Sequence, residues 1–276
     1  GLKTHCKVAM VVRKDDTGLP RIYLHLSTGN YNPATARLYT DMGLFTADPD
    51  IGYDAINLFN YLTGYSSEIH WRKLVMAPLN LRDRIVELIR REVAAHSPAP
   101  PGRIIAKMNA LVDPEIIREL YAASQAGVSI DLLVRGICCL RPGLPGISDN
   151  IRVTSVVGRF LEHTRISYFG NGGSPEIFLT SADWMPRNLN RRVEAMFPVT
   201  DAASTERITD VLATYLADTK KGRRLKADGS WERIKPAEGA EAFSSQDALL
   251  QVAAERMRAD DLDAQRTPRA LRNRRG

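Results

Sequence analysis

A pattern of polar residues that occurs twice is the strongest constraint that this sequence places on its fold. It consists of a His-x-Lys or His-x-Arg pair, a six-residue block and a carboxylate: His5, Lys7, 28–33 and Asp41 in the first occurrence, and His163, Arg165, 181–186 and Glu194 in the second. Both blocks (TGNYNP and SADWMP) run small, small, Asn or Asp, aromatic, any residue, Pro, and each carboxylate follows the start of its block by 13 positions. A pattern that recurs with one spacing predicts two homologous lobes.

The paired histidines and cations suggest a site for phosphoryl chemistry. Residues two apart on a strand share a face, so we expect His5 and Lys7 to point the same way, and His163 and Arg165 likewise. A neighbouring cation lowers the pKa of an imidazole, which keeps a nitrogen lone pair free for attack. The same cation can neutralise oxygens of a phosphoryl group in the transition state.

The carboxylates and small residues complete this interpretation. Asp41 and Glu194 can each accept a hydrogen bond from a histidine ring nitrogen, which fixes the tautomer and stabilises a charged imidazole. The small residues before Asn30 and Asp183 allow the backbone to approach a phosphate closely. The repeated pattern therefore predicts phosphoryl transfer through a histidine.

Hydrophobic periodicity predicts a mixed α/β chain. Residues 5–12 and 21–26 have strand character around the turn signal DDTG, so they predict a hairpin. Helices are expected near 53–62 and over 81–93, the second with Asn80 as its N-cap.

A βαβ unit follows. RIIAKMNAL and VSIDLLVRG are expected to be parallel strands on either side of a helix over 113–127, with Asp113 as N-cap and Gly127 after its end. The other expected elements are strands in 165–170 and 176–181 and helices in 201–218 and 244–259.

Composition limits the class of protein. At 276 residues and 44% hydrophobic, the chain can bury one large or two ordinary cores. No apolar run reaches the roughly 18–20 residues that span a bilayer, and no signal peptide is recognisable. The three cysteines (Cys6, Cys138 and Cys139) lack disulfide or metal-ligand spacing, and we expect the last two to be small core residues. These features favour a cytoplasmic protein.

The charge balance favours an anionic partner. The formal net charge is +6, which suits a nucleic acid, a phosphate-rich substrate or an anionic lipid. Part of this excess lies in KKGRRLK at 220–226 and in a C-terminal tail, where little apolar periodicity is present. We expect these charges to be solvated or disordered.

The two occurrences of the pattern differ in what precedes them. The sheet of the second lobe begins near Arg103, about sixty residues before His163, whereas four residues precede His5. The first lobe is therefore expected to be truncated at its N-terminus. The expected domains are 1–73 for the rest of the first lobe, 74–235 for the second, and 236–276 for a C-terminal helix with a basic, disordered tail.

Six stretches of this sequence resemble the C-terminal catalytic half of the long-chain bacterial polyphosphate kinases. They are KTHCK, HLSTGNYNPATARLYTD, LLVRGICCLRPGLPGISDNIRV, GRFLEHTR, YFGNGG and SADWMPRNLNRRVE. The resemblance runs from residue 1 to about 217 and is weak in the last fifty residues. It implies an α/β fold of two phospholipase D-like lobes, in agreement with the repeat.

The resemblance also implies an activity. In this family the terminal phosphate of ATP passes reversibly to an enzyme histidine and then to inorganic polyphosphate. His5 matches the histidine that is autophosphorylated, and His163 matches a second essential histidine proposed to protonate the leaving group or assist transfer. Tyr39 and Arg135 match residues that contact the nucleotide and its phosphates.

Further roles and partners follow from the same resemblance. Asp41 and Glu194 match carboxylates at the site. Mg²⁺ is the expected cofactor, with its associated arginines upstream of this chain, so no residue of this chain is assigned as a metal ligand and little activity is expected of residues 1–276 alone. No nucleic-acid partner is expected. The resemblance further implies a homo-oligomer in the cytoplasm, with peripheral association with the inner membrane left open.

Two alternative functions stay open on the sequence. A phospholipase D-like phosphodiesterase or nuclease also uses paired His-Lys lobes, but its motif normally carries an Asp soon after the Lys, and here the first Asp is Asp15. A non-catalytic polyanion-binding fragment is the second alternative. His25, His70 and His96 are expected to be structural or surface residues, and for Trp184 and Tyr31 packing is favoured over base stacking. Lys107 and Asn109 share a strand face near the expected site, where a structural role is equally open.

Overall fold

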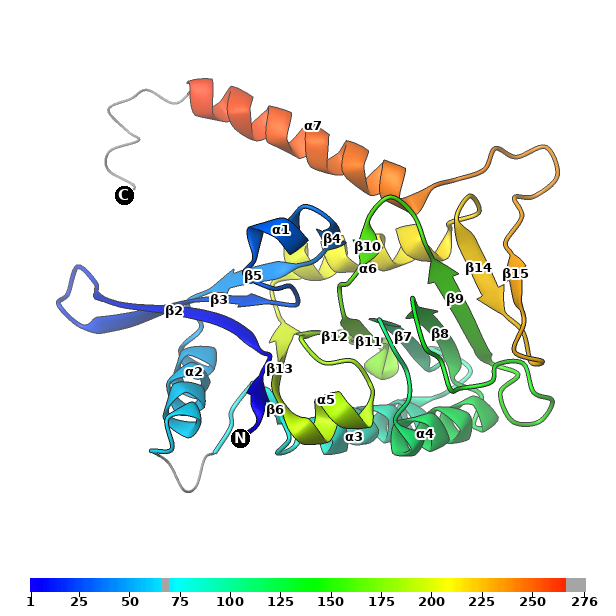
Figure 1. The fold of residues 1–276 in the computed structure, drawn as a ribbon, viewed down its shortest axis with the longest axis horizontal. Coiled ribbons are helices and arrows are strands. Elements are labelled where there is room, and N and C mark those ends of the chain that lie inside the picture. The colour runs from blue at the N-terminus through cyan, green and yellow to red at the C-terminus, as the bar shows by residue number, and fades with distance from the viewer. Residues whose placement is uncertain (66–69, 267–276) are drawn as a thin grey trace.

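The structure is a computed structural model that describes residues 1–65 and 70–266, and its core is a mixed sheet of ten strands (Figure 1). The N-terminal elements are β1 (Lys3–Thr4), β2 (Lys7–Lys14), β3 (Pro20–Ser27), α1 (Pro33–Ala36), β4 (Tyr39–Thr40), β5 (Gly43–Thr46) and α2 (Pro49–Leu62). The central elements are β6 (Val75–Ala77), α3 (Leu81–Ala95), β7 (Arg103–Met108), α4 (Pro114–Gln125), β8 (Ser129–Val134), β9 (Ile151–Val156), β10 (Leu161–Glu162), β11 (Ile166–Phe169) and β12 (Glu176–Thr180). The C-terminal elements are α5 (Pro186–Arg191), β13 (Arg192–Val199), α6 (Ala202–Leu216), β14 (Gly222–Leu225), β15 (Trp231–Arg233) and α7 (Ser245–Arg266).

The large sheet has the strand order β1-β13-β12-β11-β7-β8-β9-β14-β15, with β6 paired to β13. Strands β7, β8 and β9 are parallel to one another, and β1 is parallel to β13. Strand β11 is antiparallel to β7 and β12, and β13 is antiparallel to β12 and β6. The expected mixed α/β fold and the expected parallel pair around α4 are confirmed.

Helices cover both faces of this sheet, because successive residues of each strand point to opposite sides. On β7, Ile104 and Ala106 pack in one cluster with the buried faces of α3 and α4. Ile105, between them, packs in a second cluster with Ile208 and Leu212 of α6. Figure 1 shows α3 and α4 along one side of the sheet and α6 along the other.

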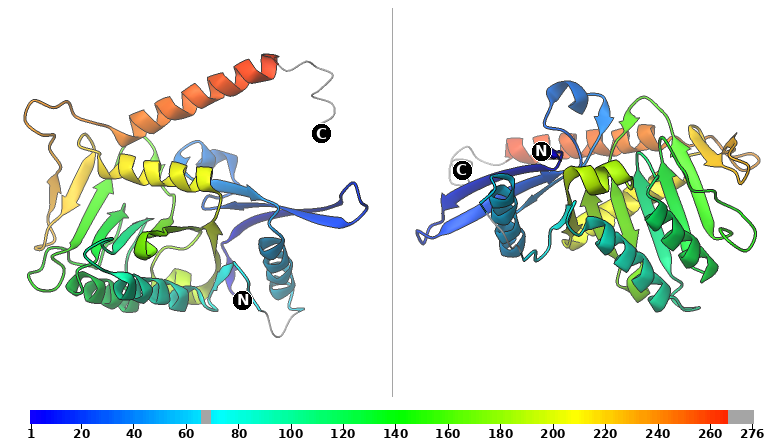
Figure 2. Two further views of the ribbon diagram at one scale, coloured as in Figure 1. Left: turned by 180° about the vertical axis from the view of Figure 1, so that it is seen from behind. Right: turned by 60° about the horizontal axis from the view of Figure 1, so that its bottom comes forward.

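A second, three-stranded sheet of order β2-β3-β5 carries the first half of the repeated pattern. The expected hairpin is confirmed, with Lys7 opposite Ser27 and Gly18 at φ +81° in its turn. The hairpin extends away from the large sheet with α2 beside it (Figure 2). Leu24, Leu26 and Leu58 nevertheless join the cluster that covers the α6 face of the large sheet. The two halves of the pattern therefore share one core.

The local signals predicted both α3 and α4 correctly, but the expected side-chain cap forms only at α4. Asp113 accepts hydrogen bonds from the N–H groups of Glu115 and Ile116, and so caps α4 as expected. Asn80 precedes α3 but makes no side-chain cap bond. Its Oδ1 accepts instead from the N–H of Met76, at 2.8 Å, so it closes the turn before the helix.

The charges of 220–226 are solvated, as expected, but part of this stretch is an ordered strand that was not predicted. Arg223 and Arg224 are exposed, as expected, but they belong to β14, which pairs with β9 and β15. Gly222 is required at the start of this strand because an added Cβ would lie 2.2 Å from the carbonyl oxygen of Asp218. The charged tail residues from 267 onward lie outside the described residues.

Several strands of the large sheet were not predicted, among them β6, β9, β13, β14 and β15, and β13 carries Glu194. Cys138 packs against the core, but Cys139 is exposed, so the expectation of two core cysteines was wrong for the second.

Candidate functional site

Each histidine of the repeat lies just beyond a two-residue strand that pairs with the other half of the repeat. Strand β1 runs parallel to β13 with Thr4 opposite Val193, and β10 runs parallel to β4 with Glu162 opposite Thr40. The next residue on each strand of these pairs is a histidine on one side and a carboxylate on the other. The register therefore brings together residues that are far apart in the sequence.

The resulting pairs are crossed between the halves. Nδ1 of His5 lies 2.8 Å from Oε2 of Glu194. Nδ1 of His163 lies 2.8 Å from Oδ1 of Asp41. The expected histidine–carboxylate contacts are thus present, while the partner of each histidine, which the spacing left open, comes from the opposite half.

The first residue of each six-residue block holds the carboxylate that follows it. Thr28 Oγ1 donates to Oδ1 of Asp41 at 2.8 Å, and Ser181 Oγ donates to Oε2 of Glu194 at 2.5 Å. Asn188, from α5, donates to the other oxygen of Glu194 at 2.7 Å. These bonds explain the common spacing of 13 positions. The role of Asn188 had no signal in the pattern.

The small residue in the first block makes room for a carboxylate. A Cβ on Gly29 would lie 2.3 Å from the carboxyl group of Asp41, so any larger residue would displace that side chain. The expected close approach of phosphate at this point stays a prediction.

The cation of each pair contacts the second nitrogen of its histidine. Lys7 Nζ lies 3.1 Å from Nε2 of His5, and Arg165 Nη1 lies 3.1 Å from Nε2 of His163. At His163, Arg165 Nη1 lies near both ring nitrogens (3.3 Å from Nδ1) and donates to the carbonyl oxygen of His163 at 3.0 Å. Carboxylates only accept hydrogen bonds, so each Nδ1 carries the proton that it donates to its carboxylate partner. In both pairs the lone pair therefore lies on Nε2.

The backbone that carries these pairs differs from the expected strand. The N–H groups of His5 and Cys6 both donate to the carbonyl oxygen of Val193, and the strand is interrupted there. The chain is likewise irregular between β10 and β11, over 163–165. Each histidine and its cation therefore lie on or beside an irregular stretch of backbone, although their side chains are in contact. The prediction of one regular strand for each pair was wrong.

The two cations differ in their neutralisation. Arg165 donates from Nε and Nη2 to the two oxygens of Asp183, at 3.2 and 3.0 Å. The equivalent position of the first half is Asn30, which is exposed and uncharged. Within the described part of the chain, no carboxylate oxygen lies within 4.0 Å of Lys7 Nζ. The first half therefore presents a cation without a paired carboxylate.

Burial and neighbouring charges alter the proton affinity of this site. Burial lowers the pKa of Lys7 to about 8; Arg165 lowers it too, while Glu194 and Asp41 act in the opposite direction. Burial also lowers the pKa of His163, with Asp41 opposing and with Arg165 and Lys7 adding to the effect. Because Lys7 acts on His163, the two halves of the repeat form one electrostatic site.

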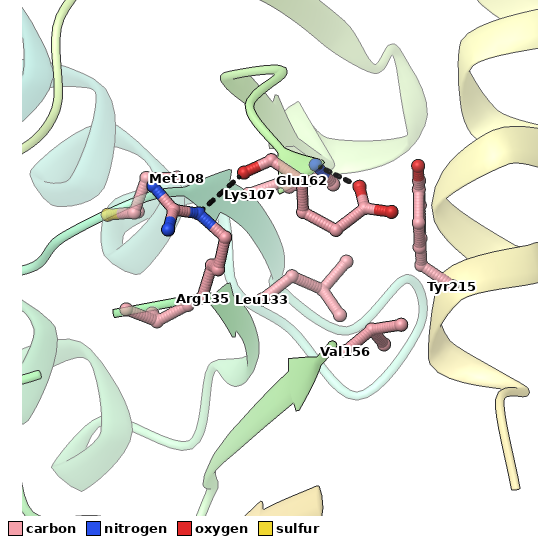
Figure 3. Close-up of a pocket in the computed structure, with 8 residues that line it drawn as sticks. Lys107, Met108, Leu133, Arg135, Val156, Glu162 and Tyr215 are labelled. Atoms are coloured by element: carbon pink, nitrogen blue, oxygen red, sulfur yellow. Dashed lines mark hydrogen bonds and ion pairs between the residues drawn. The ribbon is translucent and has the colours of Figure 1, made fainter. Parts of the chain in front are cut away.

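Tyr39 and Arg135 lie at the same site. The ring centroid of Tyr39 is 4.8 Å from that of His163. Arg135 follows β8, and its Nε donates to the carbonyl oxygen of Glu162 at 2.8 Å (Figure 3). The same Nε donates to Oδ1 of Asn109 at 3.2 Å. Besides the two histidines with their carboxylates and cations, the other two residues predicted for the site thus lie close by: Tyr39 beside His163, and Arg135 beside the residue before it.

A groove of about 570 Å³ opens beside His163. Its lining includes Tyr39, Asp41 and Thr164 together with residues of α6 and α7.

The remaining histidines and the block aromatics have other surroundings. His25 contacts Tyr31 and Phe45, His96 accepts from the N–H of Gly102, and His70 is exposed, as expected of structural or surface residues. Trp184 is 1% exposed and packs in the core.

The donor set of the site does not suit Mg²⁺. Over residues 1–65 and 70–266, no group of three or more His, Cys, Asp or Glu side chains is placed to hold a metal ion. Both carboxylates are already engaged by a histidine and a hydroxyl, so no step of the reaction is assigned to a metal. Among the described helices, none is both long and apolar enough to cross a membrane.

Comparison with known proteins identifies relatives over the whole site. The models of polyphosphate kinase C-terminal domain 1 and C-terminal domain 2 match residues 1–68 and 74–246. A polyphosphate kinase of Synechocystis sp. is 54% identical over 246 residues, which cover 89% of this chain and 34% of that protein. One of Lactiplantibacillus plantarum is 50% identical over 270 residues, 98% of this chain and 37% of that protein.

Solved structures include proteins with the same fold. The crystal structure of a polyphosphate kinase from Porphyromonas gingivalis matches with a TM-score of 0.87 and 40% identity, over 94% of this chain and 40% of that one. A phosphatidylserine synthase of Haemophilus influenzae matches with a TM-score of 0.52 and 10% identity, over 88% of this chain and 70% of that one, a likeness of fold alone.

Proposed function

The chain belongs to the polyphosphate kinase family, and on this premise we propose that its two-histidine site transfers the terminal phosphate of ATP to inorganic polyphosphate through a phosphohistidine at His5. The chain spans 34% of the length of one such relative and 37% of another, so the activity is proposed for the full-length protein. The observation that carries the proposal is the state of His5. Its Nδ1 is held by Glu194, and its Nε2 lone pair faces the unneutralised Lys7.

In the first step, Nε2 of His5 attacks the terminal phosphorus of ATP. The new N–P bond forms as the bond between that phosphorus and the bridging oxygen breaks, and ADP leaves with the electron pair. Glu194 stabilises the positive charge that develops on the ring, because its carboxylate accepts a hydrogen bond from Nδ1–H, which stays on the ring. Lys7 neutralises the phosphoryl oxygens, which gather negative charge in the transition state.

In the second step, a terminal oxygen of polyphosphate attacks the same phosphorus and the N–P bond breaks, which restores neutral His5. His163 has a lowered pKa, with its lone pair on Nε2, so at neutral pH it is a base. It accepts a proton from the attacking phosphate and, in the reverse direction, returns one to the leaving group. Such proton transfer contributes about 10²–10⁴-fold to a rate.

The neutralised Arg165 explains why the two histidines have different roles. Its charge is balanced by Asp183, so Arg165 orients His163 without offering a free cation to a phosphoryl group. Lys7 offers such a charge beside His5. The lobe with the free cation therefore carries the phosphate.

Tyr39 and Arg135 are proposed to bind the nucleotide. Arg135 uses Nε to bond the protein, and its two terminal nitrogens give it a planar fork suited to phosphate oxygens. Tyr39 borders the groove beside His163, where an aromatic ring can pack against a base or ribose. We also propose Mg²⁺ as the companion of ATP, a cytoplasmic location and a homo-oligomeric full-length protein.

The test uses the full-length protein with γ-labelled ATP and Mg²⁺. We expect protein-bound label that is lost in acid, kept in base, and absent from His5→Ala. His70→Ala, which removes an exposed histidine outside the site, is the matched control and should be labelled like the parent protein. Equal labelling of His5→Ala and the control would refute the phosphohistidine at His5.

A further inference from the structure

A buried polar network lies behind His163 and connects it to the C-terminal helix. Glu162, the residue before His163, is 4% exposed and lies 2.9 Å from Nζ of Lys107, which is equally buried (Figure 3). Oε1 of Glu162 accepts from Nε2 of Gln246 in α7, at 2.6 Å. Tyr215 of α6 also lines this region, with its ring 4.8 Å from Nζ of Lys107.

We propose that Gln246 is a positioning residue for His163, acting through Glu162 and Thr40. The effect on catalysis rests on the function proposed above, whereas the effect on the histidine itself does not.

Gln246 is attached to the segment that precedes His163. Besides its bond to Glu162, its Nε2 donates to the carbonyl oxygen of Phe160 at 2.9 Å, and its Oε1 accepts from the N–H of Phe160 at 3.0 Å. A Cβ on Gly158 would lie 2.5 Å from this Oε1, so the segment fits closely around the amide. Both polar atoms of the Gln246 side chain thus form hydrogen bonds with the segment of residues 158–162.

The position of Gln246 is itself fixed by the residue before it. Ser245, at the start of α7, donates from its N–H and its hydroxyl to Oδ2 of Asp218, at 2.8 and 2.6 Å. Asp218 is fully buried. The start of α7 is therefore held in place by Asp218. Through its contact with Glu162, Gln246 fixes the segment before His163 relative to this helix start.

Thr40 connects Glu162 to the imidazole. Its Oγ1 donates to Oε2 of Glu162 at 3.0 Å and accepts from the N–H of His163 at 3.2 Å. The residue after Thr40 is Asp41, which holds Nδ1 of His163. A shift of the Glu162 carboxylate would therefore move both the backbone of His163 and the carboxylate that orients its ring.

The variant Gln246→Glu makes this relationship pH-dependent. It places a second carboxylate against Glu162, in a region faced by Lys107 from β7, Tyr215 from α6, and the charges of Asp41 and Arg165. At low pH one of the two carboxyl groups retains a proton and can donate to the other; as pH rises, both ionise and repel. We expect kcat to fall about 10²-fold relative to the parent protein as pH rises, with KM changed little, since small displacements of reacting groups cost about this much.

The matched controls lie in the same helix and the same pair. Gln251→Glu adds the same charge at an exposed position of α7 and should keep the parent profile. The double variant Glu162→Gln with Gln246→Glu restores one amide and one carboxylate with exchanged positions, and it should recover most of the lost rate.

A second readout does not depend on catalysis. In Gln246→Leu, which adds no charge, we expect NMR titration to show a lower pKa for His163, because the contact with Asp41 that raises this pKa is weakened. Gln251→Leu should leave the titration unchanged. An unchanged pH profile in Gln246→Glu together with an unchanged His163 titration in Gln246→Leu would overturn the proposal. A parent protein without kinase activity would overturn the proposed function, while the titration would still decide the positioning role.

Discussion

Nδ1 of His5 lies 2.8 Å from Oε2 of Glu194, a residue 189 positions further along the chain. The mirror pair, His163 and Asp41, has the opposite order and a separation of 122 positions. Each half of the repeat thus supplies the histidine of one pair and the carboxylate of the other. Neither half contains an oriented histidine by itself, so the association of the halves is a condition for orienting either imidazole.

The crossed pairs predict crossed effects of substitution. Glu194→Gln removes the acceptor for the Nδ1 proton of His5, so labelling of that residue by γ-labelled ATP should slow by about 10²–10⁴-fold, as in other sites where a histidine loses its orienting carboxylate. Asp41→Asn removes the carboxylate that raises the pKa of His163, so that pKa should fall further in an NMR titration. Glu206→Gln, on the exposed face of α6, is the control for both measurements. An effect of Glu194→Gln on the His163 titration, with none from Asp41→Asn, would contradict the crossed arrangement.

Lys7 predicts how the first step depends on pH. Its pKa of about 8 means that the ammonium form, which neutralises the phosphoryl oxygens, predominates below that value and is lost above it. The rate of His5 labelling should therefore decline as pH rises through about 8. Lys7→Arg keeps the charge, because guanidinium groups stay protonated in proteins, and the decline should move to higher pH. A decline at the same pH in Lys7→Arg would show that another group is responsible.

The buried ion pair in the second half predicts a loss of stability when one member is neutralised. Arg165 and Asp183 have side chains that are 4% and 10% exposed. Asp183→Asn leaves the guanidinium buried without a carboxylate, which typically costs about 3–5 kcal/mol of unfolding free energy. The matched variant Asp50→Asn breaks an exposed pair, in which the side chains of Asp50 and Arg72 are 42% and 50% exposed. It should cost less than about 1 kcal/mol of unfolding free energy. Urea denaturation compares the two, and equal losses would argue against a buried, unscreened pair.

Equivalent aromatic residues of the two blocks predict unequal losses of packing. Trp184 is 1% exposed in the core, whereas Tyr31 is 54% exposed and contacts His25 at the surface. Trp184→Ala should lower the unfolding free energy by about 3–5 kcal/mol, the usual cost of truncating a buried large aromatic residue. Tyr31→Ala should cost about 1 kcal/mol or less, the range for surface substitutions. Similar losses in both variants, measured by thermal or urea unfolding, would show that the two positions do not differ in packing.

Much of the fold could be predicted because local signals were consistent with it. The hairpin around Gly18, the capped helix α4 and the parallel strands on either side of it all follow from turn residues, caps and periodicity. Asn80 shows the limit of such signals, because the same side chain can cap a helix or accept a bond from an earlier backbone N–H. Strand β13 was missed although it carries Glu194. It is buried on both faces, so polar and apolar residues do not alternate along it.

For the candidate site, too, some features could be predicted from the sequence and others depended on the tertiary structure. The sequence by itself determined the six residues of the repeated pattern, because a histidine, a cation and a carboxylate with a hydroxyl 13 positions earlier occur twice. Only the tertiary structure decided the pairing of His5 with Glu194 and the contact of Gln246 with Glu162. The first depends on the register of β1 against β13, and the second on where α7 starts against the sheet. The spacing of residues along the chain predicts neither contact. Strand register and helix packing bring together residues that can be separated by any number of positions in the sequence.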